Sequence, residues 1–459
     1  MIPNKMTPFG ETGDRVVWSR YNILFQSRSH GWLLFNTVSC AFLSVPDDQV
    51  LLLEGIRKDP EGFDYSSCPL LYIQLRSMGV LTEQKKDESY YAIAKMRSLT
   101  QLYGDGTLSL TVAVTRACNF DCSYCFEGNR TGSPMCQEAE DRLIRFIAAH
   151  KARQLYITWY GGEPLLAFDR ILSIDKRIRE TGKPIFASMI TNGYLLTEEK
   201  IQKLNGLGIG YLQITLDGGK ETHDSRRYLK NGGGSYDVIL RNIENLMASD
   251  FKGVLHIRVN VDGRNDDEFA DVYRYFSSRY PAEFGGRIRV YPGFVKGDGP
   301  ESGCFFDSAQ RGAFLARMYR THGIIPLSIF PTHATQSCTM THRNSFVVGP
   351  DGELYKCWDD VGISERVVGT LELKNDWDMA QIADGMVTSS YLESSECRDC
   401  LYFPVCDGGC PRVRQKNLRD GRQESTCTYF KENMEELLEL WYEKRLAEAA
   451  RAKETLNNG

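Results

Sequence analysis

Three cysteines at short spacing, Cys118, Cys122 and Cys125, are the residues of this sequence with the most specific chemistry. They follow a C-x3-C-x2-C pattern, and a [4Fe–4S] cluster normally takes four cysteine thiolates. Three thiolates would leave one iron open for another ligand. Zinc is the alternative, but it would need a fourth Cys or His nearby, and none follows before Cys136. The spacing therefore favours an iron–sulfur cluster over zinc.

A second group of cysteines follows Pro326. Cys338, Gly352 and Cys357 form a C-x13-G-x4-C pattern. The remaining cysteines of the group have a C-x2-C-x5-C-x3-C pattern followed by one distant cysteine: Cys397, Cys400, Cys406, Cys410 and Cys427. Core packing gives no reason for seven thiols at these separations, and a zinc ribbon needs only four ligands. The spacing therefore predicts further metal centres.

Both groups resemble the motifs of one enzyme family. The first resembles the signature of the radical S-adenosylmethionine (SAM) superfamily, including the aromatic Tyr124 before the last cysteine, and the second is similar to the SPASM-domain pattern in every interval. The resemblance implies that the first cluster and SAM together generate a 5′-deoxyadenosyl radical, which removes hydrogen from a C–H bond. It also implies two auxiliary clusters, and so three [4Fe–4S] clusters in all. The family's ligand sets correspond here to Cys397, Cys400, Cys406 and Cys427 for one auxiliary cluster, and Cys338, Cys357 and Cys410 for the other.

The segments that must position these cysteines alternate between strand-like and helical patterns from Leu108 onward. Amphipathic helices, such as Glu138–His150 and Thr197–Leu207, fill most gaps between the strand-like runs. The runs lie at 108–116, 154–160, 184–191, 210–216, 254–261 and 287–294. Such alternation is typical of an α/β fold with a parallel sheet covered by helices. Six units match the partial (β/α)6, TIM-like barrel of radical SAM enzymes, whose chemistry we expect at the C-terminal edge of the strands.

Two strand ends carry segments that resemble SAM-binding motifs. Gly161, Gly162 and Glu163 begin a Gly-Gly-Glu-Pro segment similar to the family's GGEP. The resemblance implies that its backbone and Glu163 hold the amino group of SAM, because glycines allow close approach and a carboxylate accepts from an ammonium. Ser188 and Asn192 belong to a segment similar to S-x-x-TNG, which places the serine near the ribose.

The next two strand ends complete the candidate SAM site. Asp217 lies in a segment similar to S-[IL]-DG, with threonine in place of serine. The segment H-D-S-R-R that follows resembles HD-x-x-R, so Arg227 is the candidate for the SAM carboxylate, and Arg226 is its competitor. Asn260, at the end of the fifth strand, could meet the adenine or the ribose.

Residues 14–83 have the pattern of a separate small domain. Strand-like runs at 21–25, 32–35 and 41–43 precede two helical stretches near Asp47–Lys58 and Pro69–Met78. This order, winged-helix-like, is similar to the PqqD-like domain (the RiPP recognition element), which binds the leader of a precursor peptide at a sheet edge. A generic N-terminal cap is the alternative. We expect a linker at 84–105, the radical SAM core at 106–325, the SPASM domain at 326–430 and a closing helix at 431–459.

The whole chain limits where the protein works and what it binds. It has 459 residues, a formal net charge of −5 and fourteen cysteines. The charge gives no electrostatic case for nucleic acid, and no apolar run approaches the roughly 18 residues needed to span a bilayer. The N-terminus has no pattern of a secretory signal. We therefore expect a cytoplasmic protein with reduced, metal-binding cysteines, no nucleic-acid partner and no membrane partner.

The leading hypothesis is an oxidoreductase that modifies a ribosomally made precursor peptide, with a flavodoxin or ferredoxin as reducing partner. The extra cysteine that several SPASM enzymes carry upstream of Cys338 is missing here, although Cys304, His333 or His342 could replace it. An open iron would suit a substrate cysteine, which favours thioether formation over carbon–carbon coupling.

Other functions stay open. Sulfatase maturation is one, although those enzymes carry an Asp directly after the C-x13-G-x4-C cysteine, where this chain has Trp358 followed by Asp359 and Asp360. A zinc or Fe–S scaffold protein without catalysis is another.

Overall fold

The structure is a computed structural model that describes residues 14–125, 127, 132–295, 305–326, 329–334, 338–372 and 377–457. In this part of the chain the largest sheet has nine strands in the order β11-β10-β9-β8-β7-β6-β12-β13-β14. Strands β6 to β11 pair in parallel with their neighbours in the order of the sequence. Their bounds are β6 Thr107–Ala113, β7 Gln154–Tyr160, β8 Ile185–Thr191, β9 Ile209–Leu216, β10 Val254–Val261 and β11 Ile288–Phe294. The predicted partial (β/α)6 barrel is confirmed, with each strand within a few residues of its predicted range.

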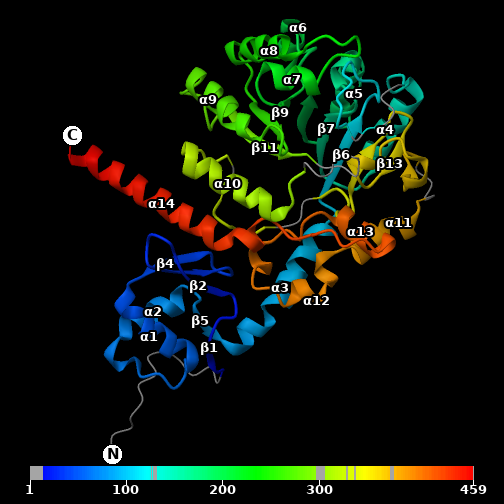
Figure 1. Ribbon diagram of the computed structural model, residues 1–459. Helices are drawn as coiled ribbons and strands as arrows, with labels where there is room; N and C mark the ends of the chain where they lie inside the picture. Colours follow the sequence, from blue (N-terminus) through cyan, green and yellow to red (C-terminus); the bar gives the residue numbers. More distant parts are fainter. Residues whose placement is uncertain are drawn as a thin grey trace, which may run out of the picture.

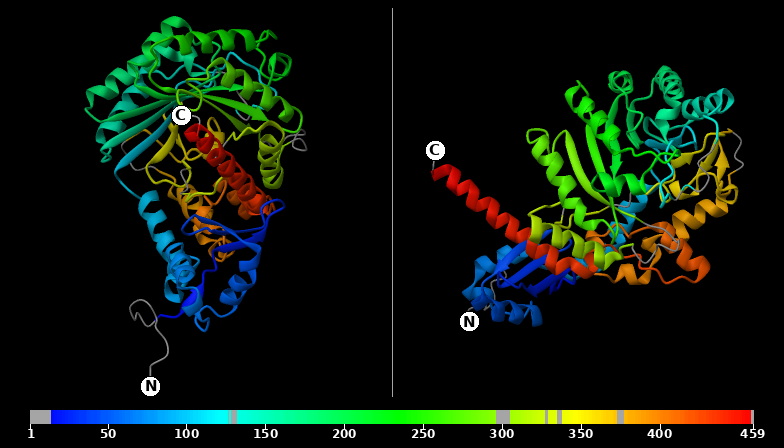
Figure 2. Two further views of the ribbon diagram at one scale, coloured as in Figure 1. Left: turned by 90° about the vertical axis from the view of Figure 1, so that its left-hand side faces the viewer. Right: turned by 45° about the horizontal axis from the view of Figure 1, so that its top comes forward.

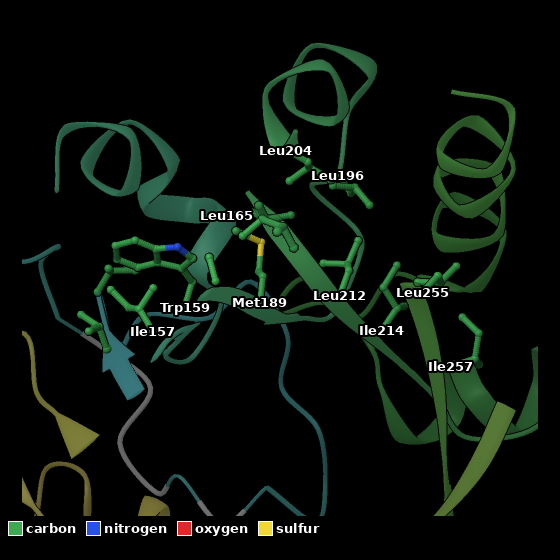
Figure 3. Packing of buried hydrophobic residues seen from close by; sticks show 14 of the residues in the cluster. Ile157, Trp159, Leu165, Met189, Leu196, Leu204, Leu212, Ile214, Leu255 and Ile257 are labelled. Atoms are coloured by element: carbon green, nitrogen blue, oxygen red, sulfur yellow. The ribbon is translucent and has the colours of Figure 1, made fainter. Parts of the chain in front are cut away.

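Helices cover the outer face of this sheet (Figure 1). They are α4 Gln137–Ala149, α5 Phe168–Glu180, α6 Glu198–Leu204, α7 Lys220–Arg226, α8 Tyr236–Ala248 and α9 Phe269–Arg279. The period-2 pattern of the strands explains the layering, since alternate side chains point to opposite faces. In β7, Leu155, Ile157 and Trp159 are buried, and in Figure 3 Ile157 and Trp159 lie among apolar residues of neighbouring elements, including Leu165 and Met189. Each such side chain contributes roughly 1.5–3 kcal/mol by burial.

The C-terminal cysteine segment is joined directly to the barrel sheet. Strand β12 (Ser345–Val348) pairs in parallel with β6, and β13 (Glu353–Tyr355) and β14 (Gly369–Thr370) continue the sheet with antiparallel pairs. These strands were not predicted from the sequence, although the three-residue apolar run 346–348 followed by Gly349 to Gly352 is a hairpin signal. Cys357 follows β13 and is thereby fixed to the barrel.

The N-terminal domain has the expected order of strands and helices. Strands β2 (Asn22–Gln26), β3 (Trp32–Asn36) and β4 (Ala41–Val45) form an antiparallel sheet in the described residues. Helices α1 (Asp47–Lys58) and α2 (Pro69–Ser77) follow it. A short strand β1 (Val16–Trp18), which was not predicted, pairs with β5 (Leu81–Glu83).

The two faces of this small sheet have different partners. Leu34 packs with residues of α1 and α2. On the opposite face, Leu33 and Phe35 pack with Val405 from the C-terminal cysteine segment and with Leu438. The N-terminal domain therefore supports the loop between Cys400 and Cys406.

Residues 84–102, within the predicted linker at 84–105, are helical. They form helix α3 (Gln84–Leu102), because the segment is rich in residues with high helix propensity such as Lys, Ala, Leu and Met. Its Tyr91 hydroxyl donates to the carbonyl of Leu392 at 2.5 Å. Lys95 lies 2.9 Å from Glu393, so α3 is also fixed to the C-terminal segment.

The closing helix lies close to its predicted range of 431–459. Helix α14 (Phe430–Asn457) packs Leu437 and Leu440 against the barrel core, and Met434 and Leu438 against the N-terminal sheet. Its far end extends away from the body of the molecule (Figures 1 and 2). The remaining helices are α10 Ser308–His322, α11 Met379–Ala383, α12 Ser395–Arg398 and α13 Pro411–Asp420. Within the described residues, no helix combines the length and apolar character that a membrane span requires.

Candidate active site

The loop that carries Cys118, Cys122 and Cys125 is held by backbone pairing with the residues after α7. Phe120 forms an antiparallel bridge with Leu229. The Asp121 amide donates to the Tyr228 carbonyl at 2.9 Å, and the Lys230 amide donates to the Asn119 carbonyl at 3.1 Å. The residues directly after the H-D-S-R-R segment therefore position the cysteine loop.

The glycines of the Gly-Gly-Glu-Pro segment permit close contact with the same loop. The Gly162 amide donates to the Thr115 carbonyl at 3.0 Å. A Cβ on Gly161, whose φ is +138°, would lie 2.2 Å from the Thr115 carbonyl oxygen, and one on Gly162 would lie 2.5 Å from that of Ala117. The close approach that these glycines allow in this structure is therefore to protein backbone, and their contact with SAM stays a prediction.

Glu163 joins two of the predicted motifs. Its side chain is fully buried and accepts hydrogen bonds from the Thr191 hydroxyl (2.6 Å), the Asn192 amide (2.8 Å) and the Leu165 amide (3.0 Å). Burial raises the pKa of Glu163, although these donors oppose the shift. A carboxylate has roughly four acceptor sites, so these contacts leave about one for an ammonium group.

Tyr124 connects the cysteine loop to three strand and helix ends. Its hydroxyl donates to Asp217 Oδ1 at 2.8 Å and accepts from Arg227 Nη1 and Asn260 Nδ2, both at 2.9 Å. A phenol hydroxyl can donate one hydrogen bond and accept two, so these three contacts use its full hydrogen-bonding capacity. The structure thus brings together four of the predicted site residues around one oxygen atom.

The two candidate arginines have different surroundings. Arg226 Nε lies 2.9 Å from Asp217 Oδ2, and its Nη2 lies 3.0 Å from Asp262 Oδ2. Burial works to raise the pKa of Asp262, but hydrogen bonds from Arg264 and Arg226 hold it below its usual value. Arg227 is 9% exposed, and its Nε has no hydrogen-bond partner among the described residues. This Nε faces the Asp217 carboxylate at 4.0 Å, beyond hydrogen-bond distance, so Arg227 keeps a donor for a carboxylate, which fits SAM.

Asp262 and His223 have structural roles that the sequence analysis missed. His223 is fully buried, its Nδ1 accepts from the Asp217 amide at 3.3 Å, and its Nε2 lies 3.0 Å from the Ser235 hydroxyl. Burial lowers the pKa of His223, so the ring is neutral and can accept. Asp262 follows β10 directly, and a polar residue at that strand end is the signal that could have found it.

The remaining predicted SAM residues lie on the inner side of the barrel or at its rim. The Ser188 hydroxyl lies 2.8 Å from that of Thr158 on the neighbouring strand. Asn192 Nδ2 donates to Asn119 Oδ1 at 2.8 Å and lies 4.0 Å from Cys118 Sγ. Asn192 therefore contacts the cysteine loop itself.

The environment of Cys118 fits a metal-bound sulfur. Cys118 Sγ accepts from the Phe120 amide at 3.4 Å, and burial raises the pKa of the thiol to about 12. Such a thiol loses its proton only when a cation replaces it, and metal coordination does so. No three His, Cys, Asp or Glu side chains of the described residues converge on a single ion position. The thiolates of a cubane bind different irons and do not need to converge in this way.

Several of the C-terminal cysteines lie close enough together for their charges to interact, and the two ligand sets stay a prediction. Besides burial, the Cys397 and Cys427 thiols contribute to raising the pKa of Cys400, and Cys397 acts likewise on Cys406. The Cys338 thiol likewise contributes to raising the pKa of Cys357. Cys410 immediately precedes α13.

His333, one of the residues that could replace the missing upstream cysteine, contacts the N-terminal domain. The His333 ring Nε2 lies 2.6 Å from the carbonyl of Val38, in the turn between β3 and β4. This ring nitrogen is thereby engaged with the N-terminal domain. Cys304 lies outside the described residues, and His342 stays a candidate.

A sheet of parallel strands with a three-cysteine loop at its C-terminal edge defines a radical SAM core. Residues 112–276 match the model of the Radical SAM superfamily. The chain is 31% identical over 346 residues to mycofactocin maturase MftC of Mycobacterium tuberculosis (strain ATCC 25618 / H37Rv), covering 67% of this chain and 78% of that protein. The chain therefore belongs to the radical SAM superfamily, whose members bind SAM and a [4Fe–4S] cluster.

Further similarities place its homologues among SPASM-type enzymes. The chain is 24% identical over 363 residues to the cysteine-type anaerobic sulfatase-maturating enzyme of Clostridium novyi (strain NT), covering 70% of this chain and 93% of that protein. The fold is similar to that of native anSMEcpe with bound AdoMet and Kp18Cys peptide, with a TM-score of 0.57, 19% identity and coverage of 75% and 99% of the two chains.

Proposed function

We propose that this protein is a peptide maturase that modifies a ribosomally made precursor peptide and forms an intramolecular thioether. The observation that carries the proposal is the packing of a small sheet against the segment between two predicted auxiliary cysteines, because the edge strand β4 of this sheet pairs on one side only among the described residues. A radical SAM core needs no such sheet to bind SAM. Its position suits a domain that delivers a bound peptide to the clusters and the barrel.

The barrel residues would divide the work of holding SAM and its cluster. Cys118, Cys122 and Cys125 would bind the cluster, Arg227 would receive the SAM carboxylate and Glu163 its amino group. Ser188 and Asn260 would meet the ribose or the adenine, while Tyr124, Asn192 and Asp217 hold the site together from the protein side. When bound, SAM and the cluster supply the 5′-deoxyadenosyl radical for hydrogen abstraction.

The C-terminal cysteines would bind two auxiliary clusters. The ligand sets remain Cys338, Cys357 and Cys410 for the first, and Cys397, Cys400, Cys406 and Cys427 for the second. A flavodoxin or ferredoxin would supply electrons, and reduced cysteines of this kind suit the cytoplasm.

The leader would bind at the edge of β4. The Ser27 amide donates to the Gly31 carbonyl and the Thr37 amide to the Tyr21 carbonyl, so every second residue of β3, including Leu33, directs its backbone groups toward β2. Ser44 lies opposite Leu33, so its amide points away from β3 and toward the free edge. Ser44 is exposed. Addition of a peptide strand there would form main-chain hydrogen bonds.

A pair of variants tests the leader site. Ser44→Pro removes the amide donor while an edge strand tolerates proline, and Ser44→Ala keeps the amide. We expect Ser44→Pro to lose affinity for the leader peptide and processing of the full precursor, with Ser44→Ala unchanged. Equal leader affinity in both variants would mean that this edge does not bind the leader. Deletion of residues 14–83 is a weaker test, because it would expose Val405 and Leu438.

Thioether formation follows from the incomplete ligand set of the first auxiliary cluster. With three cysteines in that set, a substrate cysteine could supply the fourth thiolate and lose its proton on binding. Carbon–carbon crosslinking would need no such open position. His333 points to the N-terminal domain, which supports the open-site hypothesis.

Sulfatase maturation is the second candidate, because two sulfatase-maturating families are among the homologues. The position after Cys357 is Trp358, whose ring packs 4.7 Å from that of Tyr160. Asp360 is buried and lies 2.8 Å from Arg412 Nη2, so it is committed to an ion pair. Asp359 is the remaining carboxylate near the position where those enzymes carry an aspartate.

Mass spectrometry of a treated peptide tests the function. The substrates to test are short Cys-containing peptides read from the open reading frames beside the gene, each incubated with SAM, reductant and the anaerobic protein. We expect a product that has lost two hydrogens and one alkylatable cysteine. A product whose cysteines all react with iodoacetamide would rule out the thioether. Conversion of a sulfatase-derived Cys or Ser peptide instead would favour the second candidate.

A further inference from the structure

Two cationic side chains donate to sulfur atoms of the C-terminal cysteines. Arg414 Nη2 lies 3.5 Å from Cys397 Sγ, and Lys431 Nζ lies 3.5 Å from Cys427 Sγ. Both sulfurs belong to the set that would bind the second auxiliary cluster. The Gly408 amide also donates to Cys406 Sγ, at 3.3 Å.

Arg414 is held in place by the loop that carries these cysteines. Its Nε donates to the Gly408 carbonyl at 2.9 Å while its Nη2 reaches Cys397. A guanidinium is planar, so a fixed Nε also fixes the direction of the other N–H groups. The contact with sulfur is therefore part of a two-point attachment of a half-buried side chain to the loop.

Lys431 reaches its sulfur in a different way. It lies in the first turn of α14, four residues after Cys427, and its side chain is exposed. Lysine is a flexible point charge rather than a rigid fork. Its effect on the cysteine set should therefore be the more strongly screened by salt.

We propose that Arg414 and Lys431 raise the reduction potential of the second auxiliary cluster, and so make it the preferred electron acceptor of the auxiliary pair. This inference rests on the proposed function, in which Cys397, Cys400, Cys406 and Cys427 bind that cluster. Cluster potentials depend on net charge and on hydrogen bonds to the sulfurs. Positive charge beside the sulfurs stabilises the reduced, more negative state.

An electron acceptor is required by the proposed reaction. When a C–H and an S–H bond give a C–S bond, one hydrogen atom leaves with 5′-deoxyadenosine, and a proton and an electron leave the substrate. The electron must pass out through the protein to a one-electron carrier of the flavodoxin or ferredoxin class. A more positive potential at the second auxiliary cluster would draw the electron onto that cluster first.

Redox titration of the anaerobic holoenzyme, followed by electron paramagnetic resonance, tests the proposal. The variants are Arg414→Gln, Lys431→Gln and their double, with Arg414→Lys as the variant that keeps the charge. Arg419→Gln on α13 and Lys444→Gln on α14 are matched controls, because their partners are Asp384 and Glu448. Lys444 lies roughly 20 Å along the helix from Lys431.

We expect one midpoint potential to become more negative in each Gln variant and most negative in the double, at unchanged iron content. Arg414→Lys should retain more of the potential than Arg414→Gln, and high salt should reduce the effect of Lys431→Gln. Unchanged potentials in the fully iron-loaded double variant would overturn the proposal. Iron loss from the Gln variants would also overturn it, because the cations would then serve assembly.

A Cys397→Ala variant separates this proposal from the proposed function. Loss of about a third of the iron from that variant is expected if three clusters of one type are present. Full iron content in Cys397→Ala would instead contradict the second auxiliary cluster itself.

Discussion

The cysteine loop of the barrel and the C-terminal cysteine segment hold their thiols by different means. The barrel loop is braced by backbone pairing with the residues after α7, and Cys118 Sγ accepts from the neutral amide of Phe120. In the C-terminal segment, cationic Arg414 and Lys431 reach sulfur. The segment lies between short helices and depends on the N-terminal sheet and α14 for packing. In the C-terminal segment, therefore, two cations join the backbone amide of Gly408 as donors to sulfur.

The largest expected effect on stability comes from Arg226, which braces the barrel site. Arg226→Gln removes the cation that joins the buried carboxylates of Asp217 and Asp262, which keep only Arg227 at 4.0 Å and Arg264 at 3.0 Å. We therefore expect the free energy of unfolding to fall by about 3 kcal/mol, the low end for a broken buried ion pair. Arg227→Gln should cost less stability but weaken SAM binding about 10–100-fold, since hydrogen bonds to charged groups contribute roughly 1.5–3 kcal/mol. Denaturant titration and equilibrium dialysis measure the two effects. Equal stability loss in both variants, with SAM affinity intact in Arg227→Gln, would contradict the assignment.

The next effect tests the close approach of the Gly-Gly-Glu-Pro segment to the cysteine loop. In Gly162→Ala the new methyl would lie 2.5 Å from the carbonyl oxygens of Arg116 and Ala117, so the backbone must shift. We expect a loss of about 1–3 kcal/mol, as for other overpacked sites. Gly106→Ala is the control, because a Cβ there meets no atom within 4 Å. Thermal unfolding compares them, and a Gly162→Ala protein as stable as the control would refute this packing.

The smallest expected effect concerns the joint between the N-terminal domain and the C-terminal cysteines. The Thr37 hydroxyl donates to the carbonyl of Leu401, next to Cys400, at 2.7 Å. Thr37→Val leaves that carbonyl unpaired and should cost about 0.5–1.5 kcal/mol. Thr100→Val, in which an exposed hydroxyl bonded within α3 is lost, is the control. Denaturant unfolding would show the difference, and identical midpoints would mean that this joint does not stabilise the domains.

The barrel could be predicted from the sequence because its signals are local. Alternating apolar residues define β7, and the motif residues follow strand ends, so parallel topology alone brings Glu163, Asn192 and Asp217 to one edge. The three hydrogen bonds of the Tyr124 hydroxyl could not be predicted from the sequence, because their partners lie 93 to 136 residues away along the chain. The same holds for Asp262, whose importance depends on the direction of the Arg226 side chain.

The C-terminal segment was less predictable because packing, rather than periodicity, determines its shape. Its cysteine spacing was recognisable, yet β12 joins the barrel through pairing with β6, more than 200 residues earlier. Residues 84–105 were predicted as a linker without assigned secondary structure, because the charged first turn dominated their interpretation, and helix α3 was therefore not predicted. The contacts of Arg414 and Lys431 with cysteine sulfur could not be predicted from the spacing of the cysteines.

The central claim is that Cys118, Cys122 and Cys125 hold the catalytic cluster of a three-cluster radical SAM enzyme. The most direct test compares the anaerobic protein with the variant in which all three are Ala, by iron content and by 5′-deoxyadenosine formed from SAM. We predict on the order of twelve irons per chain for the original protein, loss of about a third in the variant, and no 5′-deoxyadenosine from it. Retained 5′-deoxyadenosine production in the triple variant would contradict the account.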